Sequence, residues 1–272
     1  MPWFKNRFGE LLWYEDAGCG MPLIFVHGWC MSSAVWKKQF GVLDSSFRMI
    51  APDLRGHGRS RKVSGQIEFD RFATDLYDLV QSLGLTNVVL IGWSMGAQIA
   101  LQAYHALADR VAGLVLVSAT PSFINRKDYL FGLTSNEASG MRIKVQRSID
   151  RALSGFHARM FSVGDLENLQ GTDQIAALLA PIVLPETAVA IAALDALVQA
   201  DMRPLLAGIR VPALVINGDR DLICLPQASD YLTEHIESVR HTVFTGCGHA
   251  PFLTRPEQFN SEIISYGGSI CD

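Results

Sequence analysis

The pentapeptide Gly92-Trp93-Ser94-Met95-Gly96 decides the fold of this chain. It follows the apolar, β-rich run 87–91 and precedes 97–104, a segment of good helix formers. Gly-x-Ser-x-Gly between a strand and a helix predicts a very sharp turn, with the serine in a strained backbone conformation. Flanking side chains would collide with the neighbouring strand and helix, so glycine stands there. The turn would present the Ser94 hydroxyl at a helix N-terminus, where developing negative charge is stabilised.

Short apolar runs recur on both sides of this turn. The run Leu23–Val26 is apolar without alternation, which is typical of a strand buried on both faces. Similar runs stand at 47–51, 88–91, 114–117, 213–216 and 241–244. Helical patterns separate them, for example in 72–83, where apolar residues share one helix face that ends near Gly84. Strands that alternate with helices predict an α/β fold with a mostly parallel sheet, flanked by helices.

The alternation breaks between about Ser122 and Met202. This stretch has a helical pattern throughout, and strand signals resume at 212–217. Because it is too long for a single crossover, we predict a helical cap inserted after the sixth core strand; the alternative is one long, ordinary helical layer. The predicted boundaries are 1–121 for the first part of the core, 122–202 for the cap and 203–272 for the second part of the core.

Composition narrows the classes of function. The 272 residues are 49% hydrophobic and 18% charged, enough for one large α/β domain with an insertion or for two modest domains. A net charge of −4 gives no global signal for nucleic acid or membrane. Five widely spaced cysteines without Cys-x-x-Cys argue against a disulfide framework or zinc site. Since we find no signal peptide and no membrane-spanning run, we expect a soluble, cytoplasmic protein. We also expect it to be a monomer.

A serine hydroxyl needs an adjacent base to attack at neutral pH. The candidate base is His249, in the glycine-containing loop 246–252 that follows the last apolar run. Such a loop lies at the carboxyl edge of the sheet, within reach of Ser94. The other histidines fall in turns, in helices or in a strand, where structural roles are commoner.

The third member should be a carboxylate after the strand 213–216. Asp219 and Asp221 both follow it. We favour Asp221, because the extra residues let the chain turn back toward His249, whereas Asp219 is better placed to hold the turn. The carboxylate would fix the histidine tautomer and stabilise the imidazolium. The expected catalytic residues are therefore Ser94, Asp221 and His249, in an order known for hydrolases with this turn.

An oxyanion hole needs two backbone N–H donors. One should come from Met95, directly after the nucleophile, and the other from Trp29, in the loop after Leu23–Val26. The side chains of Trp29 and Met95 would then contact substrate, together with Phe156 from the cap; the alternative for Trp29 is a plain core residue. This chemistry requires neither a metal nor an organic cofactor.

These motifs jointly resemble the α/β-hydrolase superfamily over nearly the whole chain. The matching blocks are His27–Trp29, Asp53–Ser60, Gly92–Gly96, Gly218–Asp221 and Gly248–Phe252. Within it, the chain is most similar to the pimeloyl-[acyl-carrier protein] methyl ester esterases of biotin synthesis (BioH type), through Trp29, Trp93, Ala200–Arg203 and Gly248–Leu253. The resemblance implies a serine esterase that cleaves the methyl ester of a carrier-bound pimeloyl chain through an acyl-enzyme on Ser94. Cys30 and Ala97 depart from the pattern, since glycine is usual at both.

The resemblance also implies that cap arginines contact acyl carrier protein. The candidates are Arg142, Arg147, Arg151 and Arg159. Lys144, Arg147 and Arg151 have helical spacing that predicts one shared stripe. Residues 141–160 hold six basic residues, counting one histidine, against a single acid. Such a basic face suits an acidic partner; the alternative is an ordinary solvated helix surface.

Other functions remain open at this point. A general short-chain carboxylesterase or lactonase without a protein partner would need the same three catalytic residues. A carbon–carbon bond hydrolase would need only a different pocket, and a ligand-sensing protein could keep the fold without turnover. Dehalogenases and epoxide hydrolases are disfavoured, because those relatives use an aspartate where Ser94 stands. Cys30 and Cys247, which flank the expected site, are interpreted as buried small hydrophobes.

Overall fold

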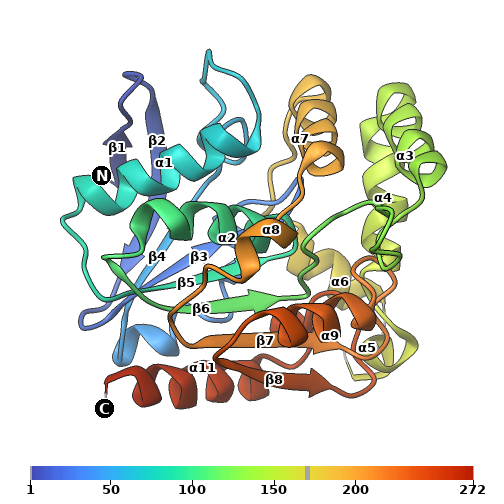
Figure 1. The fold of residues 1–272 in the computed structure, drawn as a ribbon. Coiled ribbons are helices and arrows are strands. Elements are labelled where there is room, and N and C mark those ends of the chain that lie inside the picture. The colour runs from blue at the N-terminus through green and yellow to red at the C-terminus, as the bar shows by residue number, and fades with distance from the viewer. Residues whose placement is uncertain (1, 169–171, 272) are drawn as a thin grey trace.

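The short apolar runs of the sequence form the centre of one mostly parallel sheet, seen in a computed structural model that describes residues 2–168 and 172–271. Within those residues the sheet has eight strands in the order β1-β2-β4-β3-β5-β6-β7-β8 (Figure 1). The strands are β1 (Trp3–Lys5), β2 (Leu11–Ala17), β3 (Pro22–Val26), β4 (Arg48–Pro52), β5 (Val88–Trp93), β6 (Val111–Val117), β7 (Ala213–Gly218) and β8 (Val239–Phe244). β2 pairs antiparallel with β1 and β4, and the remaining pairs are parallel.

Helices cover both faces of the sheet (Figure 1). On one face α1 (Phe69–Ser82), α2 (Met95–Leu107) and α9 (Pro226–His235) pack against alternate strand residues such as Ile24. On the other, α11 (Pro256–Cys271) packs against the intervening residues, such as Leu23, together with the 3-10 helices η1 (Ser33–Trp36) and η2 (Leu43–Ser45). Each central strand is therefore buried on both sides, as its unbroken apolar run predicts.

The hairpin of β1 and β2 is absent from the sequence-based prediction. A buried arginine attaches it to the helix layer: Arg55 donates to Glu10 at 2.8 Å and to Asp75 at 2.7 and 3.0 Å. Asn6 at the hairpin turn also donates to Asp75, at 2.8 Å. Since a buried charge is tolerated only when it is paired, this cluster fixes the hairpin against α1.

The predicted helical insertion lies between β6 and β7 and is confirmed. Its helices are α3 (Ser135–Arg147), α4 (Ile149–Arg159), α5 (Val163–Asn168), α6 (Thr172–Leu179) and α7 (Thr187–Gln199), and α8 (Arg203–Leu206) leads back to the core. Figure 1 shows α3, α4 and α7 grouped beside the carboxyl ends of the strands. The boundaries at 122 and 202 stay a prediction, and residues 169–171 lie outside the described residues. None of the described helices is long and apolar enough to cross a membrane.

The cap corrects one sequence-based expectation. The spacing of Lys144, Arg147 and Arg151 predicts one helical stripe, but the helix breaks at Ser148, whose backbone is extended (φ −166°, ψ 105°). Ser148 ends α3 and caps α4, since its hydroxyl accepts from the N–H of Arg151 at 3.4 Å. Lys144 and Arg147 therefore lie on α3 and Arg151 on α4, not on one helical stripe.

The turn between β5 and α2 has the predicted strain. Ser94 adopts φ 56° and ψ −118°, a backbone conformation that residues other than glycine rarely adopt. A Cβ on Gly92 would lie 2.4 Å from the carbonyl oxygen of Gly96, and a Cβ on Gly96 would lie 2.1 Å from that of Val26. Both collisions are with backbone atoms, so neither can be relieved by a side-chain rotation.

Gly96→Ala is expected to destabilise the fold by about 3 kcal/mol, because its methyl group meets the backbone of β3. The measurement is the midpoint of urea unfolding. Gly268→Ala is the matched control: this glycine is also helical, in α11, and an added Cβ would meet nothing within 4 Å. The control should gain stability, by about 0.5–1 kcal/mol. Equal midpoints for Gly96→Ala and the wild type would contradict the packing argument.

Candidate active site

His249 and Asp221 lie together where β7 and β8 end. Nδ1 of His249 is 2.8 Å from Oδ2 of Asp221, and both side chains are fully buried. The other carboxylate oxygen of Asp221 accepts from the backbone N–H groups of Ile223 at 2.8 Å and Cys224 at 3.0 Å. With the carboxylate held in this way, Nδ1 is the donor and Nε2 is the nitrogen left to accept a proton.

Asp219, the alternative carboxylate, points elsewhere. Its Oδ1 accepts from the backbone N–H of Gly246 at 2.7 Å, and its Oδ2 is 4.0 Å from the guanidinium of Arg220. Asp219 thus holds the turn against the loop after β8. The geometry favours Asp221 as the partner of His249.

Ser94 lies at the apex of the turn, partly exposed, and the buried thiol of Cys224 lies beside its hydroxyl. Nε2 of His249 is buried and has no hydrogen-bond partner in the described part of the chain. The structure therefore joins His249 to Asp221 but leaves the serine–histidine hydrogen bond unformed. Catalytic hydrogen bonds often tighten only when substrate is bound.

Cys224 is a site residue that the sequence analysis missed. The signal was its position three residues after Asp221, within the turn that carries the carboxylate. Burial raises the pKa of the Cys224 thiol well above its usual range, so the group beside Ser94 is a neutral thiol. Burial likewise raises the pKa of Cys30, and that of Cys247 to about 11. Protonated, buried thiols agree with the interpretation of Cys30 and Cys247 as small hydrophobes.

The two expected oxyanion donors keep their N–H groups available. Met95 is the first residue of α2, and Trp29 lies in the loop after β3. Among the hydrogen bonds of the described residues, neither backbone N–H is used as a donor. The side chain of Trp29 is fixed from the cap, because its indole N–H donates to the carbonyl of Ala190 at 2.9 Å. Its ring also meets Phe156 edge-on, at 5.2 Å between centroids.

His27 braces the loop that carries Trp29. Its Nε2 accepts from the N–H of Leu54 at 3.0 Å, and its Nδ1 lies 2.9 Å from the carbonyl oxygen of Gly28. Burial lowers the pKa of His27 to about 4 and that of the neighbouring His57 to about 3. Both imidazoles are therefore neutral and structural.

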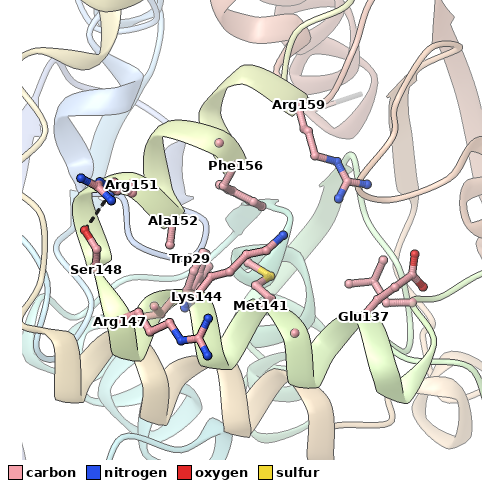
Figure 2. A pocket seen from close by; sticks show the side chains of 14 residues that line it. Trp29, Glu137, Met141, Lys144, Arg147, Ser148, Arg151, Ala152, Phe156 and Arg159 are labelled. Atoms are coloured by element: carbon pink, nitrogen blue, oxygen red, sulfur yellow. Dashed lines mark hydrogen bonds between the residues drawn. The ribbon is translucent and has the colours of Figure 1, made fainter.

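A cavity of about 630 Å³ opens between α3 and α4, with Trp29 at its inner end (Figure 2). Its apolar residues include Met141, Val145, Ala152 and Phe156. Four basic residues line it as well: Lys144, Arg147, Arg151 and Arg159. Figure 2 shows Lys144 reaching across the space between the two helices. Ser94 and Met95 are not among the lining residues, whereas Trp29 and Phe156, whose rings contact each other, both are.

The four predicted carrier-binding arginines have different environments. Arg142 pairs with Asp195 of α7 at 2.9 Å and lies outside the cavity wall. Arg159 donates to the carbonyl of Leu222 at 3.0 Å. Arg147 and Arg151 are exposed, and within the described residues neither has an ion-pair partner. Of the four arginines, these two are the most available to a ligand.

Comparison with known proteins identifies the family. The model of the alpha/beta hydrolase fold matches residues 21–256. This chain belongs to the α/β-hydrolase family. Among the described residues of this hydrolase, no group of three or more His, Cys, Asp or Glu is placed to hold a metal ion.

Curated relatives of this α/β hydrolase include pimeloyl-[acyl-carrier protein] methyl ester esterases. The protein from Nitrosomonas europaea is 32% identical over 91% of this chain and 96% of its own length. The protein from Nitrosospira multiformis is 28% identical over 94% and 97%. Among solved structures, an esterase from Exiguobacterium antarcticum superposes with a TM-score of 0.89 at 29% identity, covering 97% of this chain and 98% of its own. The resemblance expected from the motifs is thereby confirmed.

Proposed function

We propose that this α/β hydrolase is a serine carboxylesterase that hydrolyses the methyl ester of pimeloyl-[acyl-carrier protein]. The names of the relatives at 28% and 32% identity support the substrate, and the esterase among the solved structures supports the reaction class. The observation that carries the proposal is the buried 2.8 Å contact of His249 with Asp221, at the strand ends beside the strained serine turn. This is the arrangement that ester cleavage through an acyl-enzyme requires.

The reaction proceeds in two steps. Nε2 of His249 takes the proton of Ser94, whose Oγ attacks the ester carbonyl carbon, and the N–H groups of Trp29 and Met95 donate to the developing oxyanion. The tetrahedral intermediate collapses and methanol leaves with the proton from His249. Water, deprotonated by the same nitrogen, then attacks the acyl-enzyme and releases the carboxylic acid and Ser94. Asp221 stays ionised and stabilises the imidazolium throughout.

The cavity supplies a reason for a carrier-bound substrate. Trp29, Met95 and Phe156 would contact the acyl chain, and the exposed Arg147 and Arg151 offer positive charge at the cavity rim on a protein of net charge −4. An acidic carrier protein complements such a local field. Arg142 and Arg159 belong to the proposal as further contacts, although both already have partners in the cap or core. The unpaired state of Cys19, Cys30, Cys224 and Cys247 supports a reducing, cytoplasmic location.

The test compares two substrates in the wild type and in Ser94→Ala: the pimeloyl-carrier methyl ester and a short p-nitrophenyl ester. We expect Ser94-dependent cleavage of both, with a much larger kcat/KM for the carrier substrate. Ser94-dependent cleavage of the short ester alone would support the alternative function, a general short-chain carboxylesterase or lactonase without a carrier partner. The esterase fold of the Exiguobacterium antarcticum protein favours that alternative as the second candidate.

Charge reversal at the cavity rim separates the two candidates. The double variant Arg147→Glu/Arg151→Glu is expected to lower kcat/KM for the carrier ester about 30- to 100-fold, because a complementary field becomes repulsive. Cleavage of the short p-nitrophenyl ester should stay within about twofold. Arg210→Glu is the control: Arg210 is a similarly exposed cation outside the cap, and its ion-pair partner among the described residues is the exposed Glu237. If both esters respond alike to the double variant, the carrier surface lies elsewhere or does not exist.

A further inference from the structure

The cap does more than cover the catalytic turn, because it is hydrogen-bonded to the loop that carries His249. The backbone N–H of His249 donates to the carbonyl of Met160 at 2.7 Å, and the N–H of Gly248 donates to Oδ2 of Asp165, also at 2.7 Å. Met160 is the C-cap residue that follows α4, and Asp165 lies in the first turn of α5. We call this set of contacts between Met160–Asp165 and Gly246–His249 the cap clasp.

Asp165 is the centre of the clasp. Its carboxylate is fully buried, and Oδ2 also accepts from Ser162, from the backbone N–H at 3.0 Å and the hydroxyl at 3.1 Å. The hydroxyl of Ser162 in turn contacts the carbonyl oxygen of Gly246. Within the described residues the ion-pair partner of Asp165 is the guanidinium of Arg255, 3.7 Å from Oδ1.

Burying a carboxylate costs free energy, because the charge loses its contact with water. The contacts of Asp165 indicate what offsets this cost. The hydrogen bonds of Asp165 within the cap join it to Ser162, three residues away, but its bond to Gly248 spans 83 residues and reaches the loop of the catalytic base. A neutral side chain could fill the same space at lower cost. The charge strengthens the hydrogen bond from the Gly248 N–H, one of the contacts that join the two segments.

The backbone of His249 is held on both sides. Its N–H is bound by Met160 of the cap, and its carbonyl accepts from the indole N–H of Trp93 at 2.8 Å. The approach of the cap is so close that a Cβ on Gly248 would lie 2.4 Å from the carbonyl oxygen of Met160. The position of the imidazole against Asp221 therefore depends on where the cap places Met160 and Asp165.

We propose that Asp165 is a positioning residue for the hydrolytic reaction: its carboxylate binds Gly248 and thereby sets His249 against Asp221, coupling the cap to the catalytic base. This rests on the proposed function, in which His249 is that base. Asp165 touches neither the substrate nor the reacting atoms. It acts through the backbone of its neighbour in the loop.

The test compares Asp165→Ala with Asp165→Asn. Alanine removes the acceptor of the Gly248 N–H, and a displacement of the base by about 1 Å can cost on the order of 10²-fold in rate. We expect kcat to fall about 10- to 100-fold on the short p-nitrophenyl ester, with KM within about threefold. Asparagine keeps an oxygen acceptor and should retain kcat within about fivefold. Asp150→Ala, at an exposed acid of α4, is the matched control and should leave kcat unchanged.

A second readout follows the imidazole itself. The NMR signal of the Nδ1 proton of His249, which bonds to Asp221, should shift or broaden in Asp165→Ala and stay in place in Asp165→Asn and Asp150→Ala. A folded Asp165→Ala protein with wild-type kcat and an unmoved signal would overturn the proposal. So would an equal loss of kcat in both Asp165 variants with the signal intact, because that pattern indicates a structural role alone.

Two other results have to be distinguished from these: a failure of Asp165→Ala to fold, and a failure of the proposed function. If Asp165→Ala does not fold, Ser162→Ala replaces it, since it removes a hydroxyl contact to Asp165 and to Gly246 while leaving the carboxylate in place. We then expect a 3- to 10-fold fall in kcat with a shifted Nδ1 signal, and no change in either would refute the positioning role. If wild-type turnover survives Ser94→Ala, the proposed function fails, whereas the NMR comparison still tests the clasp.

Discussion

Ser94→Ala is expected to lower kcat at least about 10⁴-fold on every ester that the protein hydrolyses. Alanine has no oxygen with which to form the acyl-enzyme, while the N–H groups of Trp29 and Met95 remain to give the small residual rate. Alanine also fits the backbone as poorly as serine does at φ 56°, so the fold should change little. The measurement is steady-state hydrolysis of a p-nitrophenyl ester, with thermal unfolding as a check on the fold.

Ser238→Ala is the control for this experiment, because Ser238 is an exposed serine that precedes β8. It should hydrolyse the ester at the wild-type rate. Retention of more than about a tenth of kcat in Ser94→Ala would mean that another group, or water activated directly, attacks the ester. The assignment of the nucleophile would then be wrong.

Asp221→Asn is expected to lower kcat by about 10⁴-fold with the fold intact. The structure gives the reason. Oδ1 of Asp221 accepts from two backbone N–H groups, of Ile223 and Cys224, so the amide oxygen of asparagine must take that place. The amide NH₂ then faces Nδ1 of His249, which has to become an acceptor. The ring proton moves to Nε2, and the nitrogen that should take the proton of Ser94 already carries one.

Asp219→Asn provides the matched control, two residues away in the same turn. The amide oxygen of the new side chain would still accept from Gly246, so kcat should remain within about fivefold. Hydrolysis of the p-nitrophenyl ester by both variants, measured over a range of pH, decides between them. A large loss in Asp219→Asn with little loss in Asp221→Asn would exchange the roles of the two carboxylates.

Much of the core could be predicted because its signals are local. A parallel strand buried on both faces has to be an unbroken apolar run, and the runs at β3, β5, β6 and β7 have this pattern. The turn at Ser94 is likewise encoded in five consecutive residues. β2 has no such signal, since it lies toward the edge of the sheet and its second half carries the acids Glu15 and Asp16.

The site was harder to predict wherever it depends on contacts between distant segments. The bond of Asp165 to Gly248 joins residues 83 apart, and the ion pair of Arg142 with Asp195 joins residues 53 apart. Neither pattern exists in any short window of sequence. The break at Ser148 has a local signal, because serine favours helix N-caps, but the helical spacing of Lys144, Arg147 and Arg151 runs across it.

The place of the cap in the chain has an evolutionary consequence. β6 and β7 are neighbours in the sheet, so the segment between them is an insertion whose two ends lie on paired strands. The entropic cost of closing such a loop grows only with the logarithm of its length, about 0.6 kcal/mol for each doubling. This insertion can therefore be lengthened, shortened or replaced during evolution with little loss of stability in the sheet. New substrates can be acquired in this way. If the clasp positions His249 as proposed, a replacement for the cap must still present acceptors to the backbone N–H groups of Gly248 and His249.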